Sequence, residues 1–242
     1  MNKQTFLTLL ATFALLFSFT FSCHAKGKDK AKHVVFIGLD GWGAYSLPKA
    51  DMPNVKKLME DGAYTLKKRS ALPSSSAINW ASMFMGAGPE LHGYTEWGSK
   101  TPELPSRVLN KNGIFPTVFQ LLRDARPEAE IGCLYEWEGI KYLVDTLSLS
   151  YHYHVADCNK TPKELGNMAS SYIKEKHPAL VAICYDGPDH TGHTAGHDTP
   201  EYYEKLKELD MYVGQIVQAV KDAGMLDDTI FILTSDHGGI DK

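Results

Sequence analysis

The chain has 242 residues, of which 43% are hydrophobic and 11% aromatic, and this composition is typical of a globular protein with one sizeable core. Its formal net charge is −4, and its longest basic run is the short segment Lys67–Arg69. Binding to a nucleic-acid polymer normally requires a clustered basic surface, so the sequence argues against that class of function.

The first 25 residues have the pattern of an export signal and not of folded structure. Lys3 precedes a long stretch without Asp, Glu, Lys or Arg, and the small-residue ending at Ala25 suits cleavage. A second interpretation makes Cys23 the lipid-modified first residue of a bacterial lipoprotein; a third, an uncleaved membrane anchor, normally requires a longer apolar stretch. We therefore expect an exported protein, periplasmic or lipid-anchored in the cell envelope, that contacts a membrane only through a lipid anchor. The remainder, residues 26–242, is expected to be one domain.

Beyond the signal, short apolar runs alternate with amphipathic segments. The strand runs are rich in Val, Ile and Phe, which is typical of strands buried on both faces. In the last helical segment, apolar residues recur every three or four positions and form one stripe. The alternation predicts an α/β fold in which helices cover both faces of an open parallel sheet. In chain order, the expected elements are a strand at 33–39, helices at 52–62 and 115–125, a strand at 131–137, a helix at 161–176, a strand at 179–185, a helix at 201–223 and a strand at 229–235.

Acidic and imidazole side chains follow three of these strand runs. Asp40 follows the first, the segment 186–197 follows the third, and Asp236 and His237 follow the last. Ligands of open parallel sheets gather outside the carboxyl ends of the strands, so these side chains are expected to converge. A single Asp in such a place is commonly just a helix cap, but three instances favour a cation site.

The middle segment, DGPDHTGHTAGH, is the most specific of the three. Asp189 and His193 would face one point if they lay on a helical turn, because they are one turn apart. A carboxylate beside an imidazole suits zinc and, with lower preference, manganese. His190 and His197 are competing ligands, and a loop that is histidine-rich by chance is the alternative.

A serine cluster lies in the segment LPSSSAINWASMFMGAGPELHGY at 72–94. Serine clusters in loops usually form turns. Beside divalent cations, however, a hydroxyl such as that of Ser76 loses its proton near neutral pH and becomes a nucleophile. A carboxamide such as that of Asn79 would then donate a hydrogen bond to the oxyanion.

Four segments together resemble the successive motifs of the alkaline phosphatase superfamily, in the branch of type I phosphodiesterases and nucleotide pyrophosphatases. The resemblance implies a three-layer α/β/α sandwich, with a mixed sheet, that holds two divalent metal ions, usually Zn²⁺. It assigns Asp40, Ser76, Asp236 and His237 to one metal, and Asp189 and His193 to the other. Ser76 takes the place of the nucleophile, where this branch more often has threonine, and Asn79 that of an asparagine that contacts phosphate. The four segments, in the order of the family, are FIGLDGW, SAINWASMFMGAGPELHGY, YDGPDHTGH and LTSDHGG.

The resemblance implies hydrolysis of small phosphate esters, either phosphodiesters and nucleotide pyrophosphates or phosphomonoesters, through an intermediate on Ser76. A non-catalytic relative that binds metal or ligand is the main alternative. A phosphomutase is a lesser one, suggested by the segment DGWG, and the absence of a Cys/Ser-x-Pro-x-Arg motif around Ser76 argues against a sulfatase.

The family's second metal has a further histidine after the Asp-His motif, and no such residue follows His237 here. Two protein ligands are too few for a catalytic zinc, and a strand at 229–235 would lie near a sheet edge with nothing after it to cover the core. We therefore expect the reading frame to continue past Lys242, so that this chain lacks the C-terminal part of the fold, with a histidine next to glycine and at least one more strand and helix.

Overall fold

The computed structural model describes residues 31–156 and 162–239, and the expected signal at residues 1–25 lies outside them. The chain from Ala31 onward forms one compact unit. Among the described residues, no helix combines the length and the apolar character that crossing a membrane requires.

The core of the fold is a five-stranded sheet in the order β3-β2-β4-β1-β5, and every pairing in it is parallel. Four strands confirm the predicted runs. The fifth, β3, was not predicted, because its sequence YHYH lacks an apolar run. The parallel sheet of the α/β prediction is confirmed, and no antiparallel strand of the implied mixed sheet occurs within the described part. The strands are β1 (His33–Leu39), β2 (Ile131–Tyr135), β3 (Tyr151–His154), β4 (Leu180–Tyr185) and β5 (Thr229–Thr234).

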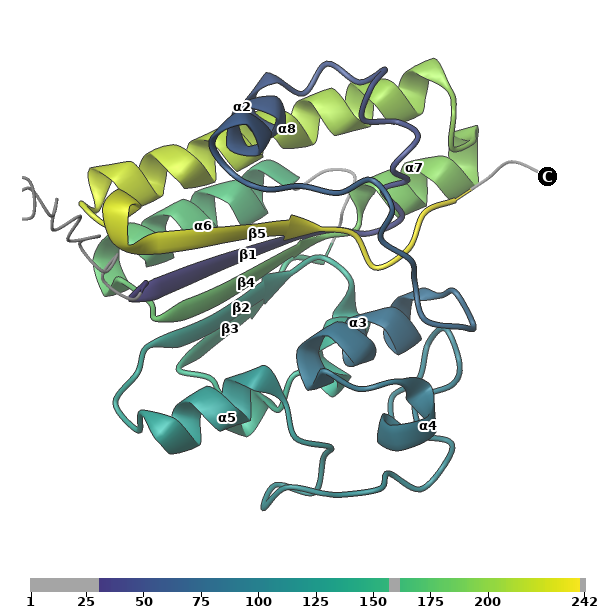
Figure 1. Cartoon of the computed structure of the whole chain (residues 1–242), viewed down its shortest axis with the longest axis vertical. Helices are drawn as coiled ribbons and strands as arrows, with labels where there is room; N and C mark the ends of the chain where they lie inside the picture. The colour runs from purple at the N-terminus through teal and green to yellow at the C-terminus, as the bar shows by residue number, and fades with distance from the viewer. Residues whose placement is uncertain (1–30, 157–161, 240–242) are drawn as a thin grey trace, which may run out of the picture. The chain divides into compact units, whose positions relative to one another are not determined.

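Helices cover both faces of the sheet and complete the three layers (Figure 1). One face carries α2, α6, α7 and α8, and the other carries α3, α4 and α5. The α-helices are α2 (Pro53–Asp61), α3 (Ser76–Met85), α4 (Pro89–His92), α5 (Val118–Ala125), α6 (Pro162–Lys176), α7 (Gly187–Ala195) and α8 (Pro200–Asp222); short 3-10 helices span Glu138–Tyr142, Thr146–Ser148 and Leu226–Asp228.

The buried strands supply a separate core to each layer, because successive side chains point to opposite faces. In β4, all of whose residues are buried, Val181 and Ile183 pack on the side of α6 and α8. Ala182 and Cys184 pack on the side of α3 and α5. The unbroken apolar run that predicted a doubly covered strand therefore reflects two distinct cores.

The strand β5 lies at an edge of the sheet and is less covered than its neighbours. Phe231 and Leu233 pack against the core beneath α8. Ile230 and Ile232, on the other face, are 51% and 43% exposed. The strand that leads to Asp236 is thus covered by the described residues on one face only.

A buried glutamate, Glu136, holds the start of α7, the helix that follows β4. It lies directly after β2 and is 4% exposed, and its Oε2 accepts a hydrogen bond of 2.8 Å from the backbone N–H of Asp186. Its Oε1 has no hydrogen-bond partner among the described residues. Burial raises the pKa of Glu136 to about 8, although the Asp186 N–H acts in the opposite direction. The sequence analysis had placed Glu136 inside the predicted strand at 131–137.

The raised pKa of Glu136 predicts a loss of stability as pH rises. The folded protein keeps a proton on Glu136 that the unfolded chain, with an ordinary pKa near 4.5, has released. Between pH 5 and pH 8 this group should therefore lower the free energy of unfolding by up to about 1.4 kcal/mol per pH unit. Glu136→Gln cannot ionise, so its stability relative to wild type should rise across this window, as measured by urea unfolding. The matched control is Glu128→Gln, at an exposed glutamate before the same strand; unfolding curves of wild type and Glu136→Gln that shift in parallel with pH would contradict the assignment.

Candidate metal centre and nucleophile

The carboxyl ends of three adjacent strands, β4, β1 and β5, bring together the side chains predicted to bind metal. Asp40 follows β1, Asp189 lies on α7 after β4, and His237 follows β5. One ligand atom from each of the three lies within 4.8 Å of the others. The convergence predicted from the strand ends is therefore present in the structure.

His237 is oriented as a metal ligand would be. Its Nδ1 lies 3.0 Å from the carbonyl oxygen of Gly238, which can only accept a hydrogen bond, so Nδ1 carries the proton. The lone pair of Nε2 then faces Asp40 Oδ1 at 3.5 Å and Asp236 Oδ2 at 3.4 Å. The same Nε2 lies 3.2 Å from Ser76 Oγ.

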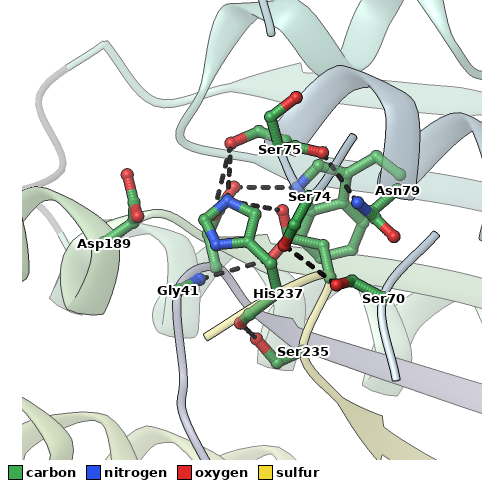
Figure 2. Close-up of polar contacts among 12 residues, drawn as sticks. Gly41, Ser70, Ser74, Ser75, Asn79, Asp189, Ser235 and His237 are labelled. Atoms are coloured by element: carbon green, nitrogen blue, oxygen red, sulfur yellow. Dashed lines mark hydrogen bonds and ion pairs between the residues drawn. The ribbon is translucent and has the colours of Figure 1, made fainter. Parts of the chain in front are cut away.

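Ser76 is the serine of the cluster that faces this centre. It is the first residue of α3, and its Oγ lies 3.5 Å from Asp40 Oδ1. The hydroxyl of Ser74 is instead exposed and lies 2.9 Å from that of Ser70. Figure 2 shows His237 between Asp189 on one side and Ser74 and Asn79 on the other. The N-terminal end of a helix also favours negative charge, which suits a serine that must lose its proton.

Gly41 allows the elements of the centre to approach one another. Its φ is +68°, and a Cβ there would lie 2.7 Å from the Cα of Asp189. Its N–H donates to Asp236 Oδ1 at 3.2 Å. The Tyr202 hydroxyl from α8 donates to its carbonyl at 2.9 Å and accepts from the N–H of Gly43 at 3.2 Å. A side chain at position 41 would both strain the turn and push α7 away from β1.

The clustered carboxylates of the centre favour the binding of a cation. Burial raises the pKa of Asp40 well above its ordinary value, and the neighbouring carboxylates of Asp236, Asp186 and Asp189 raise it further. Burial likewise raises the pKa of Asp236. Asp189 Oδ1 and Asp236 Oδ2 are buried with no hydrogen-bond partner among the described residues. Crowded carboxylates, unpaired oxygens and an imidazole lone pair together fit a divalent ion of the zinc or manganese type.

The second predicted pair of metal ligands, Asp189 and His193, is more exposed to solvent than the first set. Asp189 Oδ2 and His193 Nε2 are 3.2 Å apart on one face of α7, as the spacing predicted. The side chain of His193 is 71% exposed. His197, a competing candidate, is buried, with its ring centroid 5.7 Å from that of His193.

The carboxamide of Asn79 is hydrogen-bonded to the backbone. Its Oδ1 accepts from the N–H of Ala71 at 2.6 Å, and its Nδ2 donates to the carbonyls of Ala71 at 3.3 Å and Ser75 at 3.0 Å. Both amide hydrogens and the oxygen are therefore engaged with the backbone. These bonds hold the segment before Ser76, and the contact of Asn79 with phosphate that the resemblance implied stays a prediction.

Two side chains near the centre were not predicted. The indole Nε1 of Trp80 donates to Asp40 Oδ2 at 2.8 Å. Lys68 Nζ donates to the carbonyl of Asp236 at 3.0 Å and to that of Ser235. No pattern in the sequence marks the contact of Lys68 with the segment 235–236 or that of Trp80 with Asp40.

Comparisons with known proteins agree with the motifs. A family model for type I phosphodiesterase / nucleotide pyrophosphatase matches residues 34–241. The chain is 26% identical over 221 residues to mouse bis(5'-adenosyl)-triphosphatase enpp4, covering 87% of this chain and 48% of the relative. It is 24% identical over 214 residues to mouse ectonucleotide pyrophosphatase/phosphodiesterase family member 1, covering 84% of this chain and 24% of the relative.

Solved structures share the fold. An inactive form of murine ectonucleotide pyrophosphatase / phosphodiesterase 5 in complex with AMP matches with a TM-score of 0.67 and 19% identity, covering 86% of this chain and 57% of that one. The chain thus spans about half the length of the first of these relatives. Since the family model covers nearly all of the described chain, the protein belongs to the type I phosphodiesterase / nucleotide pyrophosphatase family of the alkaline phosphatase superfamily.

Proposed function

We propose that this protein is an exported, two-metal hydrolase of small phosphate esters that works through a phosphoserine-type intermediate on Ser76. The observation that carries the proposal is the position of the Ser76 hydroxyl, 3.2 Å from His237 Nε2 and 3.5 Å from Asp40 Oδ1 in a centre rich in carboxylates. Membership of a family of phosphodiesterases and pyrophosphatases supports the same reaction class.

Two groups of side chains would hold the metals. Asp40, Ser76, Asp236 and His237 would hold the first, and Asp189 and His193 the second. Bound divalent ions, with Zn²⁺ as the first candidate, would supply Lewis-acid stabilisation of the charge that develops on the phosphoryl oxygens.

The chain's own residues then perform the displacement. Ser76 Oγ attacks phosphorus in line with the leaving oxygen, and the bond to that oxygen breaks as the new O–P bond forms. The proton that the Ser76 hydroxyl loses ends on the leaving oxygen. The phosphoryl or nucleotidyl group remains on Ser76 until water displaces it and restores the hydroxyl. The backbone bonds of Asn79 to Ala71 and Ser75 keep the start of α3 in place during both steps.

The substrate class follows from the relatives and from the charge of the chain. One relative is named as a bis(5'-adenosyl)-triphosphatase, and a structural relative was solved with AMP. We propose phosphodiesters or nucleotide pyrophosphates as the first candidates, with phosphomonoesters second. The net charge of −4 gives no support for a nucleic-acid polymer as a partner.

A non-catalytic relative that binds metal or ligand is the second candidate function. The observation in its favour is the second metal set, in which only Asp189 and His193 are assigned and His193 is largely exposed.

The first prediction of the proposal is metal dependence. Chelation should abolish hydrolysis of aryl phosphate mono- and diesters, because without a cation the carboxylates of the centre repel the substrate phosphate. Zinc should restore the activity better than magnesium, since the centre includes imidazole nitrogens. Turnover and bound metal should be measured on the same samples. Full activity in protein shown to be metal-free would refute the two-metal mechanism.

The second prediction identifies the nucleophile. Ser76→Ala should lower turnover by about 10³-fold or more, since it removes the attacking oxygen, while bound zinc stays close to the wild-type amount. Ser74→Ala is the matched control, because its hydroxyl lies in the same cluster but contacts Ser70. An inactive Ser74→Ala beside an active Ser76→Ala would show that the assignment is wrong.

A further inference from the structure

One face of α3 contacts both oxygens of the Asp40 carboxylate. Ser76 and Trp80 are one helical turn apart and therefore point to the same side. Ser76 Oγ lies 3.5 Å from Oδ1, and the Trp80 indole N–H donates to Oδ2 at 2.8 Å. The helix that carries the nucleophile thus also holds the carboxylate that faces it.

The contact between Trp80 and Asp40 is enclosed. Trp80 is 1% exposed and Asp40 2%. The indole stacks on Phe84 with ring centroids 5.7 Å apart and meets the edge of Phe36 at 6.4 Å. Well-packed neighbours leave the indole few alternative rotamers, so its N–H has a fixed direction.

Gly38 makes room for this arrangement. It lies in β1 two residues before Asp40, on the same face of the strand. A Cβ at position 38 would lie 2.2 Å from Cη2 of Trp80. Any larger residue would displace the indole from β1.

We propose that Trp80 is a positioning residue for Asp40: its N–H engages Oδ2, so that Oδ1 alone is directed at Ser76, His237 and the metal they share. This inference rests on the proposed role of Asp40 as a metal ligand. Groups that hydrogen-bond a metal ligand fix its orientation, and their loss typically costs about 10- to 100-fold in metal affinity or activity. The indole has one donor and no acceptor, so it can hold the carboxylate without competing for the cation.

Trp80→Phe tests the proposal, since it removes the N–H and keeps an aromatic ring against Phe84. We expect about 10- to 100-fold weaker zinc binding, measured by titration of zinc alone against a competing chelator in metal-stripped protein. Phe84→Leu is the matched control: it perturbs the packing of the same indole but leaves the N–H in place. Thermal unfolding of the metal-free variants shows how much each loses in stability.

A double-mutant cycle gives an independent measurement. Gly38→Ala should weaken zinc binding about as much as Trp80→Phe, because the added methyl displaces the indole. Combined with Trp80→Phe it should add little, because the clashing Cη2 atom is then absent.

The outcomes separate the two proposals. If the wild-type protein binds zinc and Trp80→Phe binds it equally well, or if Phe84→Leu weakens binding as much, the positioning role is refuted and the proposed function stands. If the wild-type protein binds no zinc, the metal-dependent function itself is refuted, and the positioning role with it.

Discussion

The structure depends on the crowding of carboxylates at the carboxyl ends of β4, β1 and β5. Asp40 and Asp236 are almost completely buried, and Asp189 adds a third acid with an unpartnered oxygen among the described residues. Burying like charges together is costly unless a counter-charge offsets them. The N–H of Gly41 donates to Asp236, and the Trp80 indole donates to Asp40. The Tyr202 hydroxyl fixes the turn at Gly41 through the backbone. These contacts hold the acids where a divalent ion would neutralise them.

Ser76, the proposed nucleophile, comes from a different layer than Asp189, one of the proposed metal ligands. Asp189 comes from α7 on one face of the sheet, whereas Ser76 comes from α3 on the other (Figure 1). Both lie beside Asp40, which follows the carboxyl end of β1. The arrangement of the proposed site therefore requires that both layers pack correctly. The start of α3 is held by the hydrogen bonds of Asn79 to the backbone and of Trp80 to Asp40.

The strand ends were predictable from the sequence because acids or imidazoles follow three separate apolar runs, and this identified Asp40, Asp236 and His237. The contacts that depend on packing were not predictable. No local pattern indicates that Gly38 leaves space for an indole from another layer. The hydrogen bonds between the Asn79 carboxamide and the backbone of Ala71 and Ser75 were likewise not predictable. The strand β3 was missed because its four residues include two histidines and show no apolar run.

Within the described residues, β5 is one of the two edge strands of the sheet, and the candidate metal centre directly follows it. The strand pairs only with β1 in the described chain, and its isoleucines at 230 and 232 are about half exposed. Edge segments of this kind open locally at a lower free energy than central strands. Because Asp236 and His237 directly follow β5, every opening of the strand would also dismantle the ligand set. By mass action, a bound cation must then oppose the opening, so that metal occupancy and order at this edge rise and fall together.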